Sequence, residues 1–298
     1  MSAFDLQAYL GERRRVVDEA LERALPADAV PPSTVHRAMR YSVMAGGKRL
    51  RPILVIAGAE AVGASADTVM PTACALEMIH TYSLIHDDLP AMDDDDYRRG
   101  RLTSHKVFGD AIAILAGDAL LTLAFRLLAD NAARVGDPRI VCQLVADVAD
   151  AAGTLGMVGG QVVDIESEGR TVTAYTLDYI HTHKTAALIR ASLRAGARLG
   201  GAAPAALDAI GTAGDCLGLA FQIVDDILDV EGNLAELGKT AGSDERKKKV
   251  TYPAFHGVDA SRARARQLID RARQALAPLG APAEPIQALC QFVLERRS

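Results

Sequence analysis

The chain has 298 residues and a formal net charge of −5, from 33 basic and 38 acidic side chains. No strongly basic surface is implied, which argues against nucleic acid or another polyanion as a general partner. Hydrophobic residues make up 49% of the sequence, which is enough to build a sizeable buried core.

Apolar residues recur at three- and four-residue spacing along the chain, which is the period of helices packed into a core. The predicted helices, in chain order, are 13–25, 34–44, 52–62, 72–88, 110–132, 138–155, 174–199, 205–230, 260–277 and a last one from Pro285. No sustained alternation of polar and apolar residues demands a strand, and no Gly/Ser-rich linker divides the chain. We expect one all-α domain over residues 1–298, a bundle of roughly ten or more helices around a central cavity.

The sequence favours a cytoplasmic protein without a membrane span. Residues 1–15 are amphipathic and carry both acids and bases, which is not typical of a signal peptide. The most apolar stretch, 111–129, is interrupted by Gly117-Asp118 and Arg126, which favours a buried helix of a globular protein over a membrane span. The cysteines form no CxxC motif and are interpreted as buried thiols in a reducing compartment; they are Cys74, Cys142, Cys216 and Cys290.

Two aspartate clusters stand out, each on an apolar, helix-like segment. In the second cluster, Asp225 and Asp229 are spaced i, i+4 and share one helix face with Gln222. At the wall of a cavity, repulsion between two such charges approaches about 3 kcal/mol at ~5 Å and an effective dielectric near 20. A bound cation is the natural way to relieve that repulsion.

The first cluster, 87–93, contains Pro90, which makes the backbone leave the helix. We expect Asp87 to lie on the inner helix face and a turn to bring Asp93 back towards it, with Asp88 nearby. Carboxylates grouped in this way bind hard divalent cations, and Mg²⁺ typically bridges them to substrate phosphates. Two such clusters predict a diphosphate substrate that is held from both sides.

Basic residues accompany both clusters. Lys48 and Arg51 lie one helical turn apart beside Gly46-Gly47. This segment is not a P-loop, because Arg follows the Lys where Ser or Thr is required. Arg98 and Arg99 come directly after the acidic run, and guanidinium groups grip phosphate oxygens in bidentate fashion.

Further candidate bases lie in the second half of the chain. Lys184 belongs to an otherwise apolar predicted helix, and Lys239 to a glycine-bearing loop that also holds Lys249. His80 lies about two turns before Asp87 on the same side of its helix, in a position to donate to a phosphate. A zinc site is not favoured, because His181 and His183 at i, i+2 point to different sides of a helix and no third ligand has suitable spacing.

Taken together, these segments resemble the trans-type (E-) polyprenyl diphosphate synthases, and among them the bacterial farnesyl diphosphate synthases. The resemblance covers nearly the whole chain. Its motifs are GGKRLRP (46–52), HTYSLIHDDLPAMDDDDYRRG (80–100), GGQVVD (159–164), HKT (183–185), FQIVDDILD (221–229), GKTAGSD (238–244) and KVTYP (249–253). The implied fold is the all-α isoprenoid synthase fold, generally found as a homodimer.

The resemblance also implies roles for individual residues. Three Mg²⁺ ions, for which Mn²⁺ can substitute, would be held by Asp87, Asp88, Asp93, Asp225 and, in support, Asp229. The allylic diphosphate (dimethylallyl or geranyl) would be held by Arg98, Lys184, Lys239 and Lys249. Isopentenyl diphosphate would be held by Lys48, Arg51, His80 and Arg99. Thr185 and Gln222 would lie near the reacting carbons, Gln161 and Asp164 would line the cavity, and the 239–249 loop would act as a lid.

Product length is predicted from the residues just before the first cluster. Tyr82 and Ser83 precede Asp87 by five and four residues, and the helix carries their side chains down into the cavity. A bulky Tyr at this position should block a growing chain, which favours the C15 product, farnesyl diphosphate.

Four alternatives remain open at this stage. The same family includes geranylgeranyl (C20) and geranyl (C10) diphosphate synthases. A class I terpene cyclase also uses an Asp-rich cluster but should lack Lys48, Arg51 and Arg99, which serve a second diphosphate. An inactive homologue acting as a regulatory subunit should have lost one Asp-rich motif, whereas both are present here.

Overall fold

The computed structural model describes residues 4–231 and 251–296. Lys239, Lys249 and the predicted lid between them lie outside the described residues. The helices are α1 Leu6–Ala24, α2 Ser33–Val43, α3 Leu50–Glu60, α4 Ala66–Asp87, α5 Ser104–Phe108, α6 Asp110–Asp130, α7 Ala132–Val135, α8 Pro138–Ala152, α9 Met157–Ser167, α10 Ala174–Ile180, the π-helix η1 His181–Ala186, α11 Ala187–Leu199, α12 Pro204–Glu231, α14 Tyr252–His256, α15 Val258–Leu276, the 3₁₀ turns η2 Ala277–Leu279 and η3 Ala281–Ala283, and α16 Glu284–Glu295. This composition confirms the predicted all-α class.

Each predicted helix is present, but three features of the helices differ from prediction. The helix expected over 174–199 is divided into α10, η1 and α11 by a π-helical segment. Helix α9 was not predicted, because Gly156, Gly159 and Gly160 lie in or beside it and glycine has a low helix propensity. Its neighbour α8 ends at Ala152 rather than near 155, since Gly153 follows as the C-terminal cap.

A short hairpin interrupts the helical chain after the first aspartate cluster. Strands β1 Tyr97–Arg98 and β2 Arg101–Leu102 pair antiparallel, with Tyr97 opposite Leu102 and Arg98 opposite Arg101. The two turn residues, Arg99 and Gly100, both have positive φ, at 53° and 74°. Positive φ at both positions defines the type I′ turn that two-residue hairpins favour. The turn therefore fixes where Arg98 and Arg99 lie.

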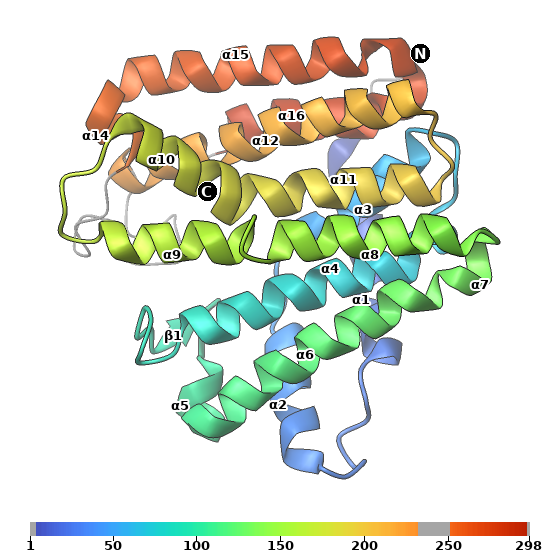
Figure 1. Cartoon of the computed structure of the whole chain (residues 1–298), viewed down its shortest axis with the longest axis vertical. Coiled ribbons are helices and arrows are strands. Elements are labelled where there is room, and N and C mark those ends of the chain that lie inside the picture. The colour runs from blue at the N-terminus through green and yellow to red at the C-terminus, as the bar shows by residue number, and fades with distance from the viewer. Residues whose placement is uncertain (1–3, 232–250, 297–298) are drawn as a thin grey trace.

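The long helices pack side by side in the order α15, α12, α11, α3, α4 and α6. Figure 1 shows this stack from top to bottom, with α9 and α8 end to end in a row that runs in nearly the same direction as α11. Helices α3 and α11 approach closely because a Cβ at Gly58 would collide with the Leu193 carbonyl and one at Gly196 with the Val55 carbonyl. Both helices contribute to two hydrophobic clusters, one built with α4, α6 and α8 and the other with α12, α15 and α16. Helices α3 and α11 thus join the two halves of the core.

Three helical stretches are long and apolar enough to cross a membrane by length and composition: Asp110–Val135, Pro138–Ser167 and Pro204–Glu231. The interruptions at Gly117, Asp118 and Arg126 therefore do not remove this hydropathy signal, and the absence of a membrane span stays a prediction. Gly117 serves packing instead, because a Cβ there would collide with the His86 ring on α4. The single domain over 1–298 likewise stays a prediction.

Candidate active site

The first aspartate cluster is folded back on itself, as predicted from Pro90. Helix α4 ends at Asp87, and the chain then turns so that the Asp93 N–H donates to the Asp87 carbonyl at 2.8 Å. Asp94 closes the turn with a positive φ of 52° and donates to the Leu89 carbonyl at 3.1 Å. Asp87 and Asp93 therefore lie close together although Pro90 separates them in sequence.

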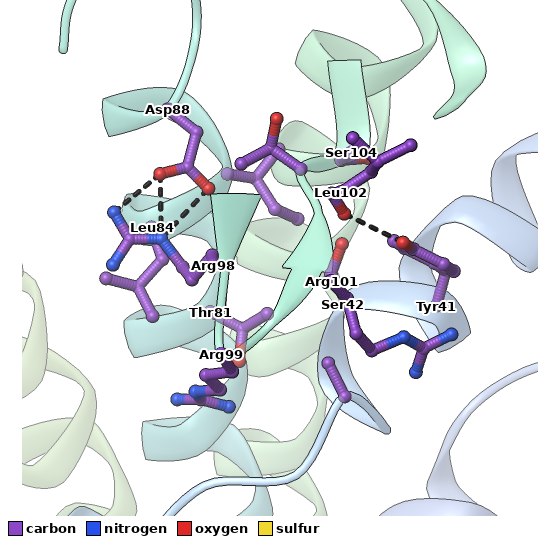
Figure 2. Close-up of a pocket in the computed structure, with 13 residues that line it drawn as sticks. Tyr41, Ser42, Thr81, Leu84, Asp88, Arg98, Arg99, Arg101, Leu102 and Ser104 are labelled. Carbon is purple, nitrogen blue, oxygen red and sulfur yellow. Dashed lines mark hydrogen bonds and ion pairs between the residues drawn. The ribbon is translucent and has the colours of Figure 1, made fainter. Parts of the chain in front are cut away.

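Asp87 and Asp88 have different surroundings. Burial, with repulsion from Asp93 and Asp88, raises the pKa of Asp87 from 3.8 to about 6, although Lys184 and Arg98 act in the opposite direction. Asp88 is buried and accepts from Arg98, with Nε at 2.7 and 2.9 Å from its two oxygens and Nη2 at 2.5 Å from Oδ1. Figure 2 shows this pairing at the end of the hairpin. The predicted metal ligand Asp88 and the predicted phosphate ligand Arg98 thus bind each other in this structure.

The π-helix brings Lys184 and Thr185 to the same region. Lys184 Nζ lies 2.6 Å from Asp164 Oδ2 on α9, and its charge acts on Asp87. Thr185 Oγ1 donates to Gln222 Oε1 on α12 at 2.9 Å. One wider helical turn therefore connects α9, α12 and the end of α4, and such π-helical turns are frequent at functional sites.

A close backbone contact fixes this turn. A Cβ at Gly160 of α9 would collide with the Lys184 backbone nitrogen and lie 2.7 Å from its Cα. The GGQVVD motif therefore contributes more than Gln161 and Asp164, because only glycine at 160 lets α9 reach the π-helix.

The second cluster lies on the last turns of α12. Asp225 Oδ1 is 3.1 Å from Arg296 Nη2, near the C-terminus, and Arg296 also lies over the Phe221 ring at 3.9 Å. Asp229 is buried, and its Oδ1 has no hydrogen-bond partner among the residues that the structure describes. Arg296 was not predicted from sequence, because nothing in the local pattern around it indicates that the chain end returns to α12.

Asp226 is a second residue that the sequence did not single out. It is buried and accepts from Gln222 Nε2 at 2.9 Å and from the Tyr252 N–H at 2.8 Å, with His181 Nε2 at 3.3 Å. The i, i+4 spacing of Gln222 and Asp226 was the available signal. Asp226 therefore orients the amide of Gln222 towards Thr185. His183 instead stacks on Tyr179 at 3.8 Å between ring centroids, so the two histidines do lie in different places.

The predicted bases of the second diphosphate site gather around the C-terminal half of α4. Burial lowers the pKa of Arg51 to about 10, with Glu77 and Arg99 as its charged neighbours. Within residues 4–231 and 251–296, the buried Arg51 Nε has no hydrogen-bond partner. Burial and four surrounding arginines, Arg51 first among them, lower the pKa of His80 well below 6.5. His80 is therefore neutral at neutral pH and offers a ring N–H.

Arg99 and Lys48 have different neighbours. Arg99 donates to the Gly46 carbonyl, and its guanidinium lies so close to Gly47 that a Cβ there would be 2.6 Å away. Gly47 also has a φ of +126°, so a glycine is required for both reasons. Lys48 is close enough to Arg296 and Asp225 for their charges to act on its pKa, which partial desolvation lowers. A small cavity of about 40 Å³ between Arg98, Arg99, Thr81 and the end of α2 borders this group (Figure 2).

The donor set fits a divalent cation that arrives with phosphate. Among the described residues, no three His, Cys, Asp or Glu side chains converge as in an all-protein metal cage. Mg²⁺ is usually held by one or two carboxylates together with substrate phosphates. The buried Oδ1 of Asp229, which finds no partner in the described part of the chain, is an oxygen ligand that such an ion would satisfy. Asp87, Asp93, Asp225 and Asp229 are the residues that would hold it.

Known proteins share this fold and this arrangement of carboxylates and bases. The sequence signature of the polyprenyl synthetase family matches residues 32–278. The chain belongs to this family, and it is a trans-prenyltransferase with the isoprenoid synthase fold.

Individual relatives support the assignment over the full length. The chain is 47% identical over 296 residues to a dimethylallyltranstransferase of Fischerella ambigua, covering 99% of this chain and 85% of the relative. It is 43% identical to a farnesyl diphosphate synthase of Geobacillus stearothermophilus, covering 99% of both. The structure matches that of a geranylgeranyl pyrophosphate synthetase from Pyrococcus horikoshii with a TM-score of 0.88 at 31% identity, covering 98% of both chains.

Proposed function

We propose that the chain condenses isopentenyl diphosphate with dimethylallyl or geranyl diphosphate, with Mg²⁺, to give (2E,6E)-farnesyl diphosphate. The observation that carries this proposal is the presence of two separate groups of bases. Lys184 and Arg98 lie beside the first aspartate cluster, whereas Arg51, Arg99 and His80 form a second group. Two groups of bases suit two diphosphates, and a terpene cyclase needs only one.

The reaction breaks the allylic C–O bond and forms a C–C bond to the double bond of isopentenyl diphosphate, after which a proton is lost. Bound Mg²⁺ supplies Lewis-acid stabilisation of the charge on the departing diphosphate. Lys184 and Arg98 hold that diphosphate and stabilise the same charge. The oxygens of Thr185 and Gln222, which are linked by a hydrogen bond, would stabilise the allylic cation. The released diphosphate accepts the proton, so no separate base is required.

Relatives of similar identity include both farnesyl and geranylgeranyl diphosphate synthases, so the C15 product is proposed from residues of this chain. Tyr82 supports C15: its side chain is buried on α4, and its ring meets that of His86 edge-on at 5.7 Å. Burial, together with the charge of Asp87, raises the pKa of Tyr82. Ser83 donates to the His80 carbonyl at 2.8 Å and presents less bulk. We expect Tyr82, as the bulkier of the two side chains, to be the one that limits the length of the growing chain.

Replacing Tyr82 with Ala is expected to lengthen the products beyond C15, because it removes the ring that blocks the growing chain. Chromatographic sizing of labelled products measures the effect. Tyr175→Ala, at a largely exposed tyrosine of α10, is the matched control and should keep the wild-type product. An unchanged C15 profile for Tyr82→Ala would show that another residue sets the length.

One assay tests the activity itself. The purified protein is incubated with labelled isopentenyl diphosphate, dimethylallyl diphosphate and Mg²⁺, and the products are sized. Elongation to C15 supports the proposal, and a C20 or C10 product assigns the chain to a geranylgeranyl or geranyl diphosphate synthase. No elongation at all refutes the proposed activity and favours a regulatory homologue.

Activation by Mg²⁺ is expected to weaken as the pH falls through about 6, the raised pKa of Asp87. Below this pH the Asp87 carboxylate binds a proton, which a cation must displace, so the apparent affinity for Mg²⁺ falls on acidification and recovers as pH rises. The half-saturating Mg²⁺ concentration, measured across the pH range with fixed substrates, checks this. A constant value on both sides of the pKa would contradict it.

We also propose a cytoplasmic homodimer. Helices α6 and α9 carry exposed apolar side chains, namely Ile114, Leu115, Val158, Val162 and Ile165, and larger exposed apolar surfaces mark association sites. Light scattering tests the oligomeric state. If a Leu115→Lys variant stayed dimeric, the interface would have to lie elsewhere than on α6. A monomeric wild type would refute the dimer.

A further inference from the structure

The GGKRLRP segment contains a base that faces away from the predicted ligand. Arg49 lies between Lys48 and Arg51, yet its side chain is only 1% exposed. It donates from Nε to Asp18 on α1, from Nη1 to Glu77 on α4 and from Nη2 to the Val43 carbonyl at the end of α2, each at 2.7 Å. Three elements of the fold therefore meet at this guanidinium.

The backbone of Arg49 is unusual as well. It is the residue before α3 and has φ 51° and ψ 36°, in the left-handed region. A non-glycine residue in this region persists when its surroundings over-determine it, and the three contacts do so here. The turn at Arg49 lets Lys48 approach Asp225 and Arg296 while Arg51 approaches Glu77 and Arg99.

Glu77 is the anion around which these cations gather. Its side chain is 2% exposed, and its charge acts on Arg49, Arg51 and Arg99. Glu77 lies three residues before His80 on α4, so it is on the side of the helix that faces the second group of bases. A buried carboxylate that loses its partner is strongly destabilised and attracts the nearest available base.

We propose that Arg49 is a positioning residue for the isopentenyl diphosphate site, because its pairing with Glu77 leaves Arg51 and Arg99 available to the diphosphate. This inference rests on the proposed function. Without Arg49, Glu77 becomes an unpaired buried anion, and Arg51 or Arg99 turns inward to neutralise it. The diphosphate then has to compete with Glu77 for these guanidinium groups.

The test separates positioning from general stability. Arg49→Met removes the charge, Glu77→Gln removes the anion, and the double variant removes both. Arg49→Met is expected to raise the KM for isopentenyl diphosphate by about 10- to 100-fold, in line with truncation of one partner of a buried charge pair. The KM for the allylic diphosphate should change by less than about threefold, because Lys184 and Arg98 are untouched. The double variant should recover most of the KM, since no unpaired anion remains.

A matched control is available on the same helices. Arg13 of α1 pairs with Glu60 at 2.7 Å, and Glu60 is the last residue of α3, at the opposite end of that helix from Arg49. Arg13→Met should lower the melting temperature but leave the KM for isopentenyl diphosphate unchanged. Equal increases in both KM values for Arg49→Met, or no recovery in the double variant, would overturn the proposal. If Arg49→Met does not fold, Arg49→Lys can be used, which keeps the charge but loses the planar guanidinium. It should give a smaller increase in the KM for isopentenyl diphosphate, again with little change in the KM for the allylic diphosphate.

A direct binding measurement tests the role of Arg49 independently of the condensation activity. Calorimetry with inorganic pyrophosphate in the absence of divalent cations measures the basic site without turnover. Weaker binding by Arg49→Met than by wild type and Arg13→Met supports the positioning role even in a protein that does not elongate isopentenyl diphosphate. Equal binding by the three proteins overturns it, whatever the outcome of the product assay.

Discussion

Replacing Asp87 with Asn is expected to lower kcat for the condensation by about 10²- to 10³-fold or more, the effect of removing one group that stabilises charge in a transition state. Asn keeps the size of the side chain and removes the charge needed to hold a cation. Because burial raises the pKa of Asp87, its neutral replacement should not destabilise the fold at neutral pH. Steady-state kinetics at saturating Mg²⁺ measure the loss of kcat, and a thermal melt measures the stability of the fold.

Asp94→Asn is the matched control for this substitution. Asp94 belongs to the same acidic run, is exposed, and has a positive φ that Asn tolerates. Its replacement should leave kcat within about twofold, as for a surface change away from special contacts. Similar losses for both variants would mean that the total charge of the loop, rather than Asp87 itself, matters.

Replacing Gly160 with Ala is expected to impair both stability and turnover. The new Cβ would collide with the backbone of Lys184, and overpacking of this kind costs about 1–3 kcal/mol. The displaced π-helix would carry Lys184 away from Asp164 and Thr185 away from Gln222. Thermal unfolding gives the loss of stability, and kcat with both substrates saturating gives the loss of alignment.

Gly11→Ala in α1 is the corresponding control, because no described residue lies within 4 Å of a Cβ at that position. There the substitution should be neutral or stabilise the helix by up to about 1 kcal/mol, the difference in helix propensity. If Gly160→Ala kept wild-type stability and kcat, the close contact between α9 and the π-helix would have no functional importance.

Local sequence patterns predicted the helices and the two aspartate clusters well. Helix periodicity located α4 and α12, and Pro90 predicted the turn that brings Asp93 back to Asp87. These features depend on residues close in sequence. The hairpin was not predicted, because its turn relies on Arg99 adopting a left-handed conformation that its residue type does not favour.

Features that depend on distant partners were missed. Arg296 meets Asp225 across 71 residues of sequence, and Arg49 meets Glu77 across 28. Only the packing of α1, α3, α4 and the chain end on one another makes these pairs. The π-helix at His181–Ala186 likewise reflects tertiary contacts, since no propensity scale distinguishes its residues from an ordinary helical turn.

The pairing of Arg98 with Asp88 has a thermodynamic consequence. A diphosphate bound by Arg98 would release both oxygens of Asp88, and a metal ion bound by Asp88, the predicted ligand, would release the guanidinium. The two ligands are then coupled in equilibrium, and by reciprocity each must strengthen the binding of the other by the same factor. The ion pair of the free enzyme thereby favours joint occupancy over either ligand alone.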